Sequence, residues 1–450
     1  MDECVTGCKK CVGGFLITNF VHWFRDSSPY IQAHRNKTFV INFGGEALQK
    51  DNFQTLIHDF TLLSSLGIRL VLVHGIRPQI DERLSKLHHP ARFHNRLRIT
   101  DEVALQCVKE AAGLVRVEIE AQLSMGLANS PMENSELKVA SGNFVVAKPI
   151  GVIDGVDYLY TGAVRKINSA AIHAQLEQNN LVLISPIGYS PSGDVFNLSA
   201  EQVATSVAIA LKAEKLIFLT EESCVDSVSR QLIAQLTAQE AQDLLLKNDD
   251  LLDSLHPPLN AAIESCSAGI DRVHLLNRQI DGALLQELFT RDGVGTLISA
   301  TPYEICRRAT LSDIGGILEL IKPLEQQGVL AKRSREKIEM EINDYWIISR
   351  DGLVIGCSAL HVNTKEDCAV LACLAVHVDY QGAARGQRLY DQAFEQAKNT
   401  RLSKLFVLST QTAQWFIERG FESCALENLP NSLKALYNPL RNSRILFKTL

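Results

Sequence analysis

Short apolar runs alternate with amphipathic stretches through the first two thirds of the chain. Each run is bounded by glycine or polar residues and is too short for a membrane span, which is typical of buried strands. A stretch with helical spacing, 53–66, follows the first run and ends at Gly67. This alternation predicts an α/β fold with a doubly wound, mostly parallel sheet, covered on both faces and binding ligands at the carboxyl ends of its strands. The runs are 38–43, 70–74, 144–147, 182–185, 215–220 and 273–276.

The pattern changes after residue 298. We expect 299–304 to be a linker and 305–450 to form a second α/β domain, which begins with a strand, a helix and a strand pair. A nearly all-apolar run, 370–378, is followed by a turn of small residues and by a helical stretch from Arg385. A strand, a small turn and a helix start offer free N–H groups and the positive end of a helix dipole to a phosphate.

The residues before the first strand are expected to form a helix that follows a tail. Aromatic residues recur at helical spacing in 20–34, and Pro29 should stop or bend that helix. The helix packs on its own domain or docks on a neighbouring subunit. Residues 1–19 are expected to be a disordered tail or an over-long start. Its cysteine spacing can ligate an iron–sulfur cluster, but nothing else supports that chemistry and no metal site is predicted; the residues are Cys4, Cys8 and Cys11.

Composition narrows the class of protein. A chain of 450 residues is long enough for two to four domains at ~150 residues each. The net charge of −6 provides no basic footprint for nucleic acid. Eleven scattered cysteines fit a reducing cytosol better than a disulfide framework. No apolar run reaches the length of a membrane span, so we expect a cytoplasmic protein with no membrane association.

The turn after the run 370–378 reads Gln381-x-x-Ala384-x-Gly386. It resembles the pyrophosphate turn of the GCN5-related N-acetyltransferases (GNAT), Arg/Gln-x-x-Gly-x-Gly/Ala, although Ala384 replaces the usual glycine. Alone, the turn is equally compatible with an ordinary strand–helix corner. The strand 404–409 and the later Arg-Gly-Phe at 419–421 follow in the order of that family. The resemblance implies acetyl-CoA contacts from Leu374, Ala375, Val376, Gln381, Gly382, Ala383, Ala384, Arg385 and Gly386.

The segments FVINFGGEAL, LVLVHGIRPQID and AEKLIFLTEE resemble the amino-acid-kinase fold, with N-acetylglutamate kinase nearest. The residues that phosphoryl transfer requires are missing. The first strand carries no lysine, and Ile76 and Arg77 interrupt the glycine run after the second strand. We therefore interpret 20–298 as a kinase-like regulatory domain without kinase activity, an interpretation that tight ATP binding would contradict. The resemblance to arginine-inhibited relatives implies an allosteric arginine site at Tyr30, His274, Glu287 and Gly293.

A kinase-like domain followed by a GNAT domain resembles the bacterial amino-acid N-acetyltransferases, the N-acetylglutamate synthase family. The resemblance implies transfer of acetyl from acetyl-CoA, a co-substrate, to the α-amino group of L-glutamate, with feedback inhibition by L-arginine. It also implies a homo-oligomer, a hexamer, and no permanently bound cofactor. Ser409 would act as the acid, and the backbone of Cys373 would hold the oxyanion and substrate. The carboxylates of glutamate would be met by Arg333, Arg441 and Ser443.

One residue departs from this family in a way that affects the chemistry. The general base of the family is a glutamate three residues before the Cys373 position, and here that residue is Val370. Glu366 lies ~13 Å away along an extended strand, and loss of a general base costs ~10²–10⁴-fold. The alternative is therefore a catalytically impaired, arginine-responsive binding protein derived from this enzyme.

Overall fold

The computed structural model describes residues 9–450 except 50–52, 127–131, 136, 227, 228, 248–252, 351 and 383, and side chains from residue 21 on except 435 and 436. Cys4, Cys8, the side chain of Cys11, Asp351 and Ala383 therefore lie outside the described part. The chain divides into two compact units, Met1–Thr301 and Pro302–Leu450. Each unit is described by itself.

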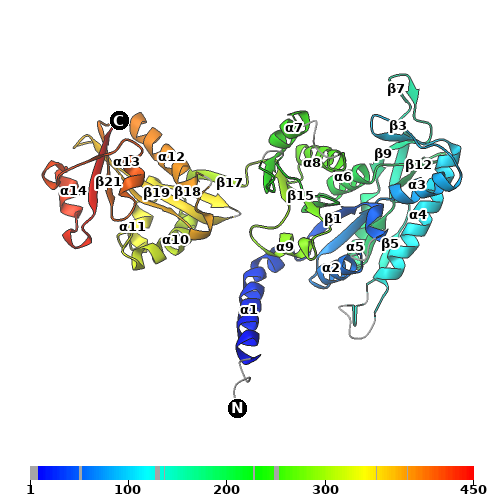
Figure 1. Ribbon diagram of the computed structural model, residues 1–450, viewed down its shortest axis with the longest axis horizontal. Helices are drawn as coiled ribbons and strands as arrows, with labels where there is room; N and C mark the ends of the chain where they lie inside the picture. Colours follow the sequence, from blue (N-terminus) through cyan, green and yellow to red (C-terminus); the bar gives the residue numbers. More distant parts are fainter. Residues whose placement is uncertain are drawn as a thin grey trace, which may run out of the picture. The chain divides into compact units, whose positions relative to one another are not determined.

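An eight-stranded sheet forms the centre of the first unit (Figure 1), with the order β14-β16-β15-β13-β1-β2-β10-β5. Its neighbouring strands are parallel except for the antiparallel pair β15–β16, which confirms the predicted sheet. The strands are β1 Thr38–Phe43, β2 Arg69–His74, β5 Val139–Ser141, β10 Leu181–Ile184, β13 Lys215–Thr220, β14 Gln235–Thr237, β15 Arg272–Asn277 and β16 Thr296–Ser299.

Helices cover both faces of this sheet, because alternate residues of the buried strands enter two separate cores. Val40 belongs to the core under α6, α7 and α8, whereas Phe39 and Ile41 belong to the core under α2, α3, α4 and α9. This arrangement explains why the strands are apolar on both faces. The helices are α2 Phe53–Ser65, α3 Arg77–Lys86, α4 Glu102–Leu123, α5 Ser169–Glu177, α6 Ala200–Leu211, α7 Ala238–Lys247, α8 His256–Ser267 and α9 Ala283–Phe289.

The run at 144–147 does not join the main sheet as its apolar pattern had suggested. Its strand, β6 Val145–Pro149, pairs antiparallel with β9 Gly162–Ile167 and parallel with β11 Ile187–Tyr189 in a four-stranded sheet with β12 Val195–Asn197. Local periodicity reports a buried strand but not its partner strand. Two small hairpins complete the unit: β3 Arg92–His94 with β4 Leu97–Ile99, and β7 Val152–Ile153 with β8 Val156–Asp157.

The N-terminal helix α1, Lys9–His34, projects from the first unit (Figure 1) and continues through Pro29. The expectation that Pro29 would stop the helix was therefore wrong. Contacts on both sides of the proline hold α1 on α9: Ser27 Oγ donates to one main-chain carbonyl of α9 at 3.1 Å, and His34 Nε2 lies 2.9 Å from another. These contacts offset the backbone hydrogen bond that a proline cannot donate. No helix in the described part of the chain is long and apolar enough to cross a membrane.

The second unit contains a seven-stranded sheet with the order β17-β18-β19-β20-β21-β23-β22, antiparallel except for the pair β20–β21. Helices α10 and α11 cover one face, and α12 and α13 cover the other (Figure 1). The elements are β17 Glu304–Arg308, α10 Ile314–Gln326, α11 Arg335–Met340, β18 Tyr345–Arg350, β19 Leu353–Asn363, β20 Cys368–Val376, α12 Arg385–Asn399, β21 Lys404–Ser409, α13 Ala413–Ile417, β22 Glu422–Ser423, α14 Asn431–Leu436 and β23 Arg444–Thr449.

Candidate functional site

The parallel strands β20 and β21 part at the centre of the second sheet. Their pairing runs from Cys368 opposite Lys404 to Leu371 opposite Val407, although β20 continues to Val376. Beyond this point the backbone of β20 has no β21 partner in the described ladder. A parting of parallel strands exposes N–H and C=O groups to a ligand inserted between them.

A β-bulge lies immediately after this point, at Cys373. Ala359 of β19 faces Ala372, whereas Cys357 faces Ala375, so β20 carries one extra residue. Cys373 has a φ of 53°, in the left-handed region. Bulges redirect backbone groups next to functional sites. The sequence predicted that the backbone of Cys373 would be used, but the bulge itself had no sequence signal.

The thiol of Cys373 points into the core and does not line an open site. Its sulfur lies 4.0 Å from that of Cys357, whose thiol is 3.4 Å from the main-chain carbonyl of Cys373. Hydrogen bonding between the thiols lowers the pKa of Cys373 and raises that of Cys357, and the charge of Arg333 lowers the pKa of Cys373 further. The charge of Arg333 therefore acts on the thiol at the bulge.

Arg441 contacts the loop between α10 and α11, and Arg333 is a residue of that loop. Arg441 donates to the main-chain carbonyl of Val329 at 2.9 Å, and Thr410, just after β21, donates to the same carbonyl at 3.3 Å. The N–H of Arg333 donates to Glu325 Oε1 at 2.8 Å. The Arg333 guanidinium donates to the Ala331 carbonyl at 2.9 Å, so both guanidinium groups contact this loop, which Thr410 joins to the end of β21.

Ser409 ends β21 next to these groups and is buried. Its Oγ accepts the N–H of Thr412 at 3.0 Å and lies 3.0 Å from Thr412 Oγ1. Ser443 is also buried, one residue before Arg444, which pairs with Ser409. The structure therefore groups Arg333, Cys373, Ser409, Arg441 and Ser443 at the end of the β20–β21 pairing.

The turn before α12 carries two residues in the left-handed region. Gly382 has a φ of 94°, and Ala384, which precedes α12, has a φ of 54°. An alanine in this conformation costs ~1–2 kcal/mol, which explains why the family pattern has glycine there. A Cβ on Gly386 would come no closer than 4.0 Å to Trp415 in this structure, so packing within the chain does not require glycine at that position.

The side chain of Arg385 is held by Glu304 of β17. Arg385 Nη2 lies 2.5 Å and Arg350 Nη1 lies 3.1 Å from Glu304 Oε1. Burial raises the pKa of Glu304, but the hydrogen bonds and charges of Arg385 and Arg350 outweigh it and lower the pKa. Because its guanidinium is held by Glu304, Arg385 would contact acetyl-CoA from its position in the first turn of α12. Arg388 is a second cation in the same turn.

Glu366 does not reach the position of the missing base. Its carboxylate accepts the side-chain amide of Asn363 at 2.9 Å and the N–H of Ser432 at 3.3 Å, which holds it on the β19–β20 loop. Val370 packs in a cluster with Phe406 and Leu429. Val370 therefore takes part in apolar packing on one side.

The predicted arginine site of the first unit is a buried network around Glu287. Oε1 lies 2.7 Å from His274 Nδ1, and Oε2 accepts the N–H groups of Val294 and Gly295 at 2.8 and 2.9 Å. Burial raises the pKa of Glu287, but the bond to His274 and these N–H groups outweigh it, so the pKa is lowered and the group is a carboxylate. Glu287 is thus no surface residue, and three hydrogen-bond partners hold its carboxylate in place.

Two buried groups that the sequence interpretation missed complete this network. Lys215 Nζ lies 3.4 Å from His274 Nε2, and the buried His34 of α1 has its pKa lowered to about 4 by burial and by the charge of Lys215. A lysine that opens the otherwise apolar strand 215–220 was the available sequence signal. Tyr30 lies one helical turn before His34, with a distance of 6.4 Å between their ring centroids.

The Gly44–Gly45 pair and Gly75 of the kinase-like unit lie against each other. A Cβ on Gly75 would lie 3.0 Å from the nitrogen of Gly45, and Gln79 donates to the Gly45 carbonyl at 2.8 Å. Ile76 is buried beside them, and Asn42, at the end of β1, donates to the Val73 carbonyl at 3.2 Å. Apolar packing therefore occupies the segment in which a kinase carries its glycine run.

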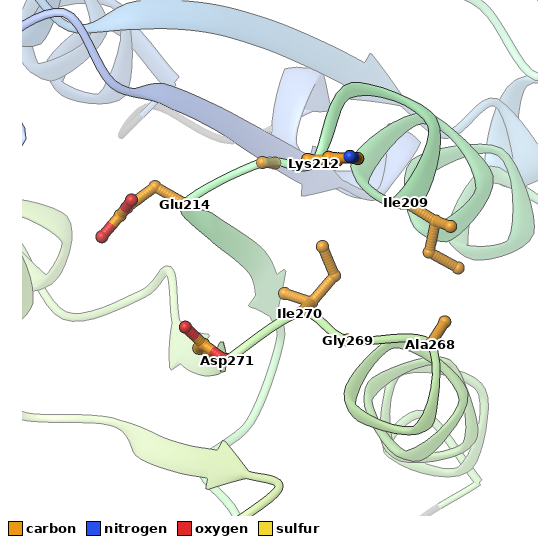
Figure 2. A pocket seen from close by; sticks show the side chains of 8 residues that line it. Ile209, Lys212, Glu214, Ala268, Gly269, Ile270 and Asp271 are labelled. Atoms are coloured by element: carbon orange, nitrogen blue, oxygen red, sulfur yellow. The ribbon is translucent and has the colours of Figure 1, made fainter.

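A shallow pocket of about 270 Å³ lies elsewhere in the first unit, at the amino ends of β13 and β15 (Figure 2). Lys212, Glu214 and Asp271 supply its charged groups. None of the residues that line it is one of the predicted site residues, so we assign this pocket to neither candidate site.

Comparisons with known proteins agree with both halves of the chain. The Amino acid kinase family model matches residues 37–277, and the Acetyltransferase (GNAT) family model matches residues 316–421. The Amino-acid acetyltransferase of Enterobacter sp. (strain 638) is 47% identical over 436 residues, which cover 96% of this chain and 98% of the relative. That of Azotobacter vinelandii is 48% identical over 433 residues, covering 96% and 100%.

Solved structures agree as well. The N-acetylglutamate synthase of Neisseria gonorrhoeae complexed with coenzyme A and L-arginine is 39% identical, covers 96% of this chain and 99% of its own, and has a TM-score of 0.87. The same enzyme complexed with coenzyme A and N-acetyl-glutamate is 40% identical, with a TM-score of 0.62. The family resemblance predicted from the sequence motifs is confirmed, and the chain belongs to the amino-acid acetyltransferase family.

Proposed function

We propose that this acetyltransferase transfers the acetyl group of acetyl-CoA to the α-amino group of L-glutamate and is inhibited by L-arginine. The observation that carries the proposal is the parting of β20 and β21 at the Cys373 bulge, with Arg333 and Arg441 beside it. Acyl transfer requires backbone donors for the oxyanion, and a dicarboxylate acceptor requires cations. Both requirements meet at this place.

The reaction begins with glutamate held through its carboxylates by Arg333, Arg441 and Ser443. The α-ammonium group is mostly protonated at neutral pH and must lose a proton before its lone pair attacks the acetyl carbonyl. The N–H groups of β20 beyond Leu371 stabilise the oxyanion, and the CoA thiolate then leaves. Ser409, whose hydroxyl is buried at the end of β21, passes its proton to that thiolate and is reprotonated by the proton that the attacking nitrogen loses as the amide forms.

Acetyl-CoA is a co-substrate in this proposal and binds along the turn before α12. The first turn of α12 contains two arginines and no acidic residue. The positive end of the helix dipole and the free N–H groups at such a helix start favour an anion, here the pyrophosphate of acetyl-CoA. Gln381, Gly382, Ala384 and Gly386 keep the backbone approachable, and Leu374–Val376 pair with the pantetheine amides.

Arginine binds at the Glu287 network, where a guanidinium can share the carboxylate with His274. Gly293, His274 and Tyr30 would complete the site, and helix α1 would couple it to a partner subunit in a homo-hexamer. We place the enzyme in the cytoplasm, in keeping with its free cysteines: all eight described ones are unpaired. Sedimentation equilibrium measures the assembly.

Thiol release from acetyl-CoA tests the function directly. The purified full chain is assayed with and without L-glutamate, and with increasing L-arginine. Glutamate-dependent release that arginine suppresses is the expected result. Release that is independent of glutamate would show a different acceptor.

Val370 favours one second candidate, an arginine-responsive binding protein that has lost catalysis. It predicts no thiol release, with acetyl-CoA and arginine still bound in calorimetric titrations. The same set of measurements therefore separates the two functions.

A further inference from the structure

A synthase of this kind needs a proton acceptor near the parted strands, and position 370 cannot supply one. If the proposed function holds, a residue other than Val370 must accept the proton. The strand register identifies the place to search, because residues directly opposite in an antiparallel pair point to the same face of the sheet. Val370 of β20 lies directly opposite His361 of β19.

His361 shares this face with residues of the candidate site. Its neighbour two residues earlier, Ala359, is the cross-strand partner of both Tyr345 and Ala372, the residue before the Cys373 bulge. Cβ atoms of directly opposite residues are ~5 Å apart. The imidazole is therefore next to the volume that a carboxylate at position 370 would have occupied.

Two carboxylates orient the His361 ring. Nδ1 lies 3.1 Å from Asp344 Oδ2, just before β18, and Nε2 lies 3.9 Å from Glu341 Oε2, just after α11. When Nδ1–H donates to Asp344, Nε2 carries the lone pair and can accept a proton. The imidazolium that forms then lies between two anions, which stabilise it.

Two unpartnered polar atoms lead from His361 toward the bulge. Among the described residues, Glu341 Oε2 and Tyr345 Oη are buried and have no hydrogen-bond partner. A buried polar atom without a partner costs ~1–3 kcal/mol, so a ligand or water that bonds both atoms is favoured here. Burial and the charges of Cys373 and Glu341 raise the pKa of Tyr345, although the charge of Arg333 opposes them.

We propose that His361 Nε2 accepts the proton that the α-ammonium group of glutamate must lose, through one water molecule held by Glu341 and Tyr345. One N–H bond of the ammonium breaks and its electron pair stays on nitrogen to attack the acetyl carbon. The water receives that proton and passes another to Nε2. Asp344 is a positioning residue that selects the ring tautomer. Tyr345 is a hydroxyl donor and not the base, because its phenol stays protonated.

The variant His361→Gln tests the proposal in the full chain, with thiol release as the readout. We expect kcat/KM for glutamate to fall ~10²–10⁴-fold, with the dissociation constant of acetyl-CoA unchanged by calorimetry. The acidic limb of the pH–rate profile should change, because the proton acceptor is gone. His173→Gln, on α5 of the first unit, is the matched control and should keep the wild-type rate and profile.

A second-site change separates a proton acceptor from a structural residue. His361→Gln/Val370→Glu places a carboxylate opposite position 361, and we expect it to recover at least ~10-fold in rate, with an acidic limb at lower pH than the wild type. A purely structural histidine would not be rescued in this way. Asp344→Asn should lower the rate less than His361→Gln and should also change the acidic limb.

The outcomes are distinct. If His361→Gln keeps the wild-type rate and pH profile, the proposal is overturned while the acetyl transfer stands. If His361→Gln does not bind acetyl-CoA, the fold is lost and the profile of Asp344→Asn decides: an unchanged acidic limb overturns the proposal. If the wild type releases no thiol in response to glutamate, the proposed function fails and this inference fails with it.

Discussion

Replacing Gly293 with alanine should damage the Glu287 network more than its backbone conformation alone requires. Gly293 has a φ of 61°, and a Cβ there would lie 2.2 Å from Glu287 Oε2. The carboxylate would have to move away from the N–H groups of Val294 and Gly295, which it accepts at 2.8 and 2.9 Å. The variant therefore tests whether the glycine exists to admit this carboxylate.

The expected cost has two parts. The left-handed conformation costs an alanine ~1–2 kcal/mol, and loss of one hydrogen bond to a charged group costs ~1.5–3 kcal/mol. We expect Gly293→Ala to lower the free energy of unfolding of the first unit by about 3 kcal/mol. That loss corresponds to about 6–12 °C in the melting temperature of a unit this large.

Gly282→Ala is the matched control. Gly282 precedes α9 with a φ of 69°, and a Cβ there would meet only the Gln286 side chain, at 3.7 Å. It should lose only the conformational part, ~1–2 kcal/mol. Calorimetric unfolding of both variants measures the difference, and arginine titrations should show weakened binding for Gly293→Ala alone. Equal melting temperatures and equal arginine affinity in the two variants would refute this reasoning.

Three further predictions concern other charged groups. Burial and the charge of Asp281 raise the pKa of Asp59 from 3.8 to about 7. Between these pH values the folded state keeps a proton that the unfolded state loses, so the free energy of unfolding falls as the pH rises through this range. After a discount for partial exposure, Asp59→Asn should gain ~1–2 kcal/mol in urea unfolding at pH 8 and nothing at pH 3. Glu304→Gln should destabilise the second unit by ~2 kcal/mol at pH 7 because it removes the charge that Arg385 and Arg350 share. Since the pKa of Glu304 is lowered, the wild type should lose this advantage as the pH falls below the ordinary range of a glutamate, and a pH-independent difference would contradict the pairing. Arg333→Lys should raise KM for glutamate ~10-fold or more and leave KM for acetyl-CoA unchanged, because lysine cannot bind a carboxylate bidentately; steady-state kinetics decide, and equal changes in both constants would argue against the assigned role.

Periodicity predicted five strands of the main sheet (β1, β2, β10, β13 and β15) and the helices α2 and α12, because buried parallel strands are apolar on both faces. The helices α3 to α9 and the strands β5, β14 and β16 were not predicted. Periodicity failed where a tertiary partner decides the outcome. The run at 144–147 has the composition of a main-sheet strand but pairs in a separate sheet, and α1 passes through Pro29 because Ser27 and His34 hold it on α9. Helix α9 is far from α1 in the sequence, whereas β9 follows β6 closely and draws it into the separate sheet.

The candidate site was predictable only as far as motifs extend. Arg333, Ser409 and Arg441 were found by resemblance, and the structure brings them together around the α10–α11 loop. The bulge at Cys373, the buried Lys215 and the pair His361–Asp344 had no motif, since each depends on strand register or on an element distant in the chain. Register is set by sheet packing, which no local pattern reports.

Ala384 and Val370, the two departures from the family pattern of the acetyltransferase domain, therefore have different consequences for catalysis. Ala384 occupies the left-handed conformation that the turn needs, so its effect is a strain of ~1–2 kcal/mol and not a lost contact. Val370 removes a titratable group, and no strain energy can replace a proton acceptor. A compensating group must then lie on the same face of the sheet within one strand spacing. His361, held between Asp344 and Glu341 directly opposite Val370, meets that requirement, whereas Glu366 is held on its loop by Asn363 and Ser432.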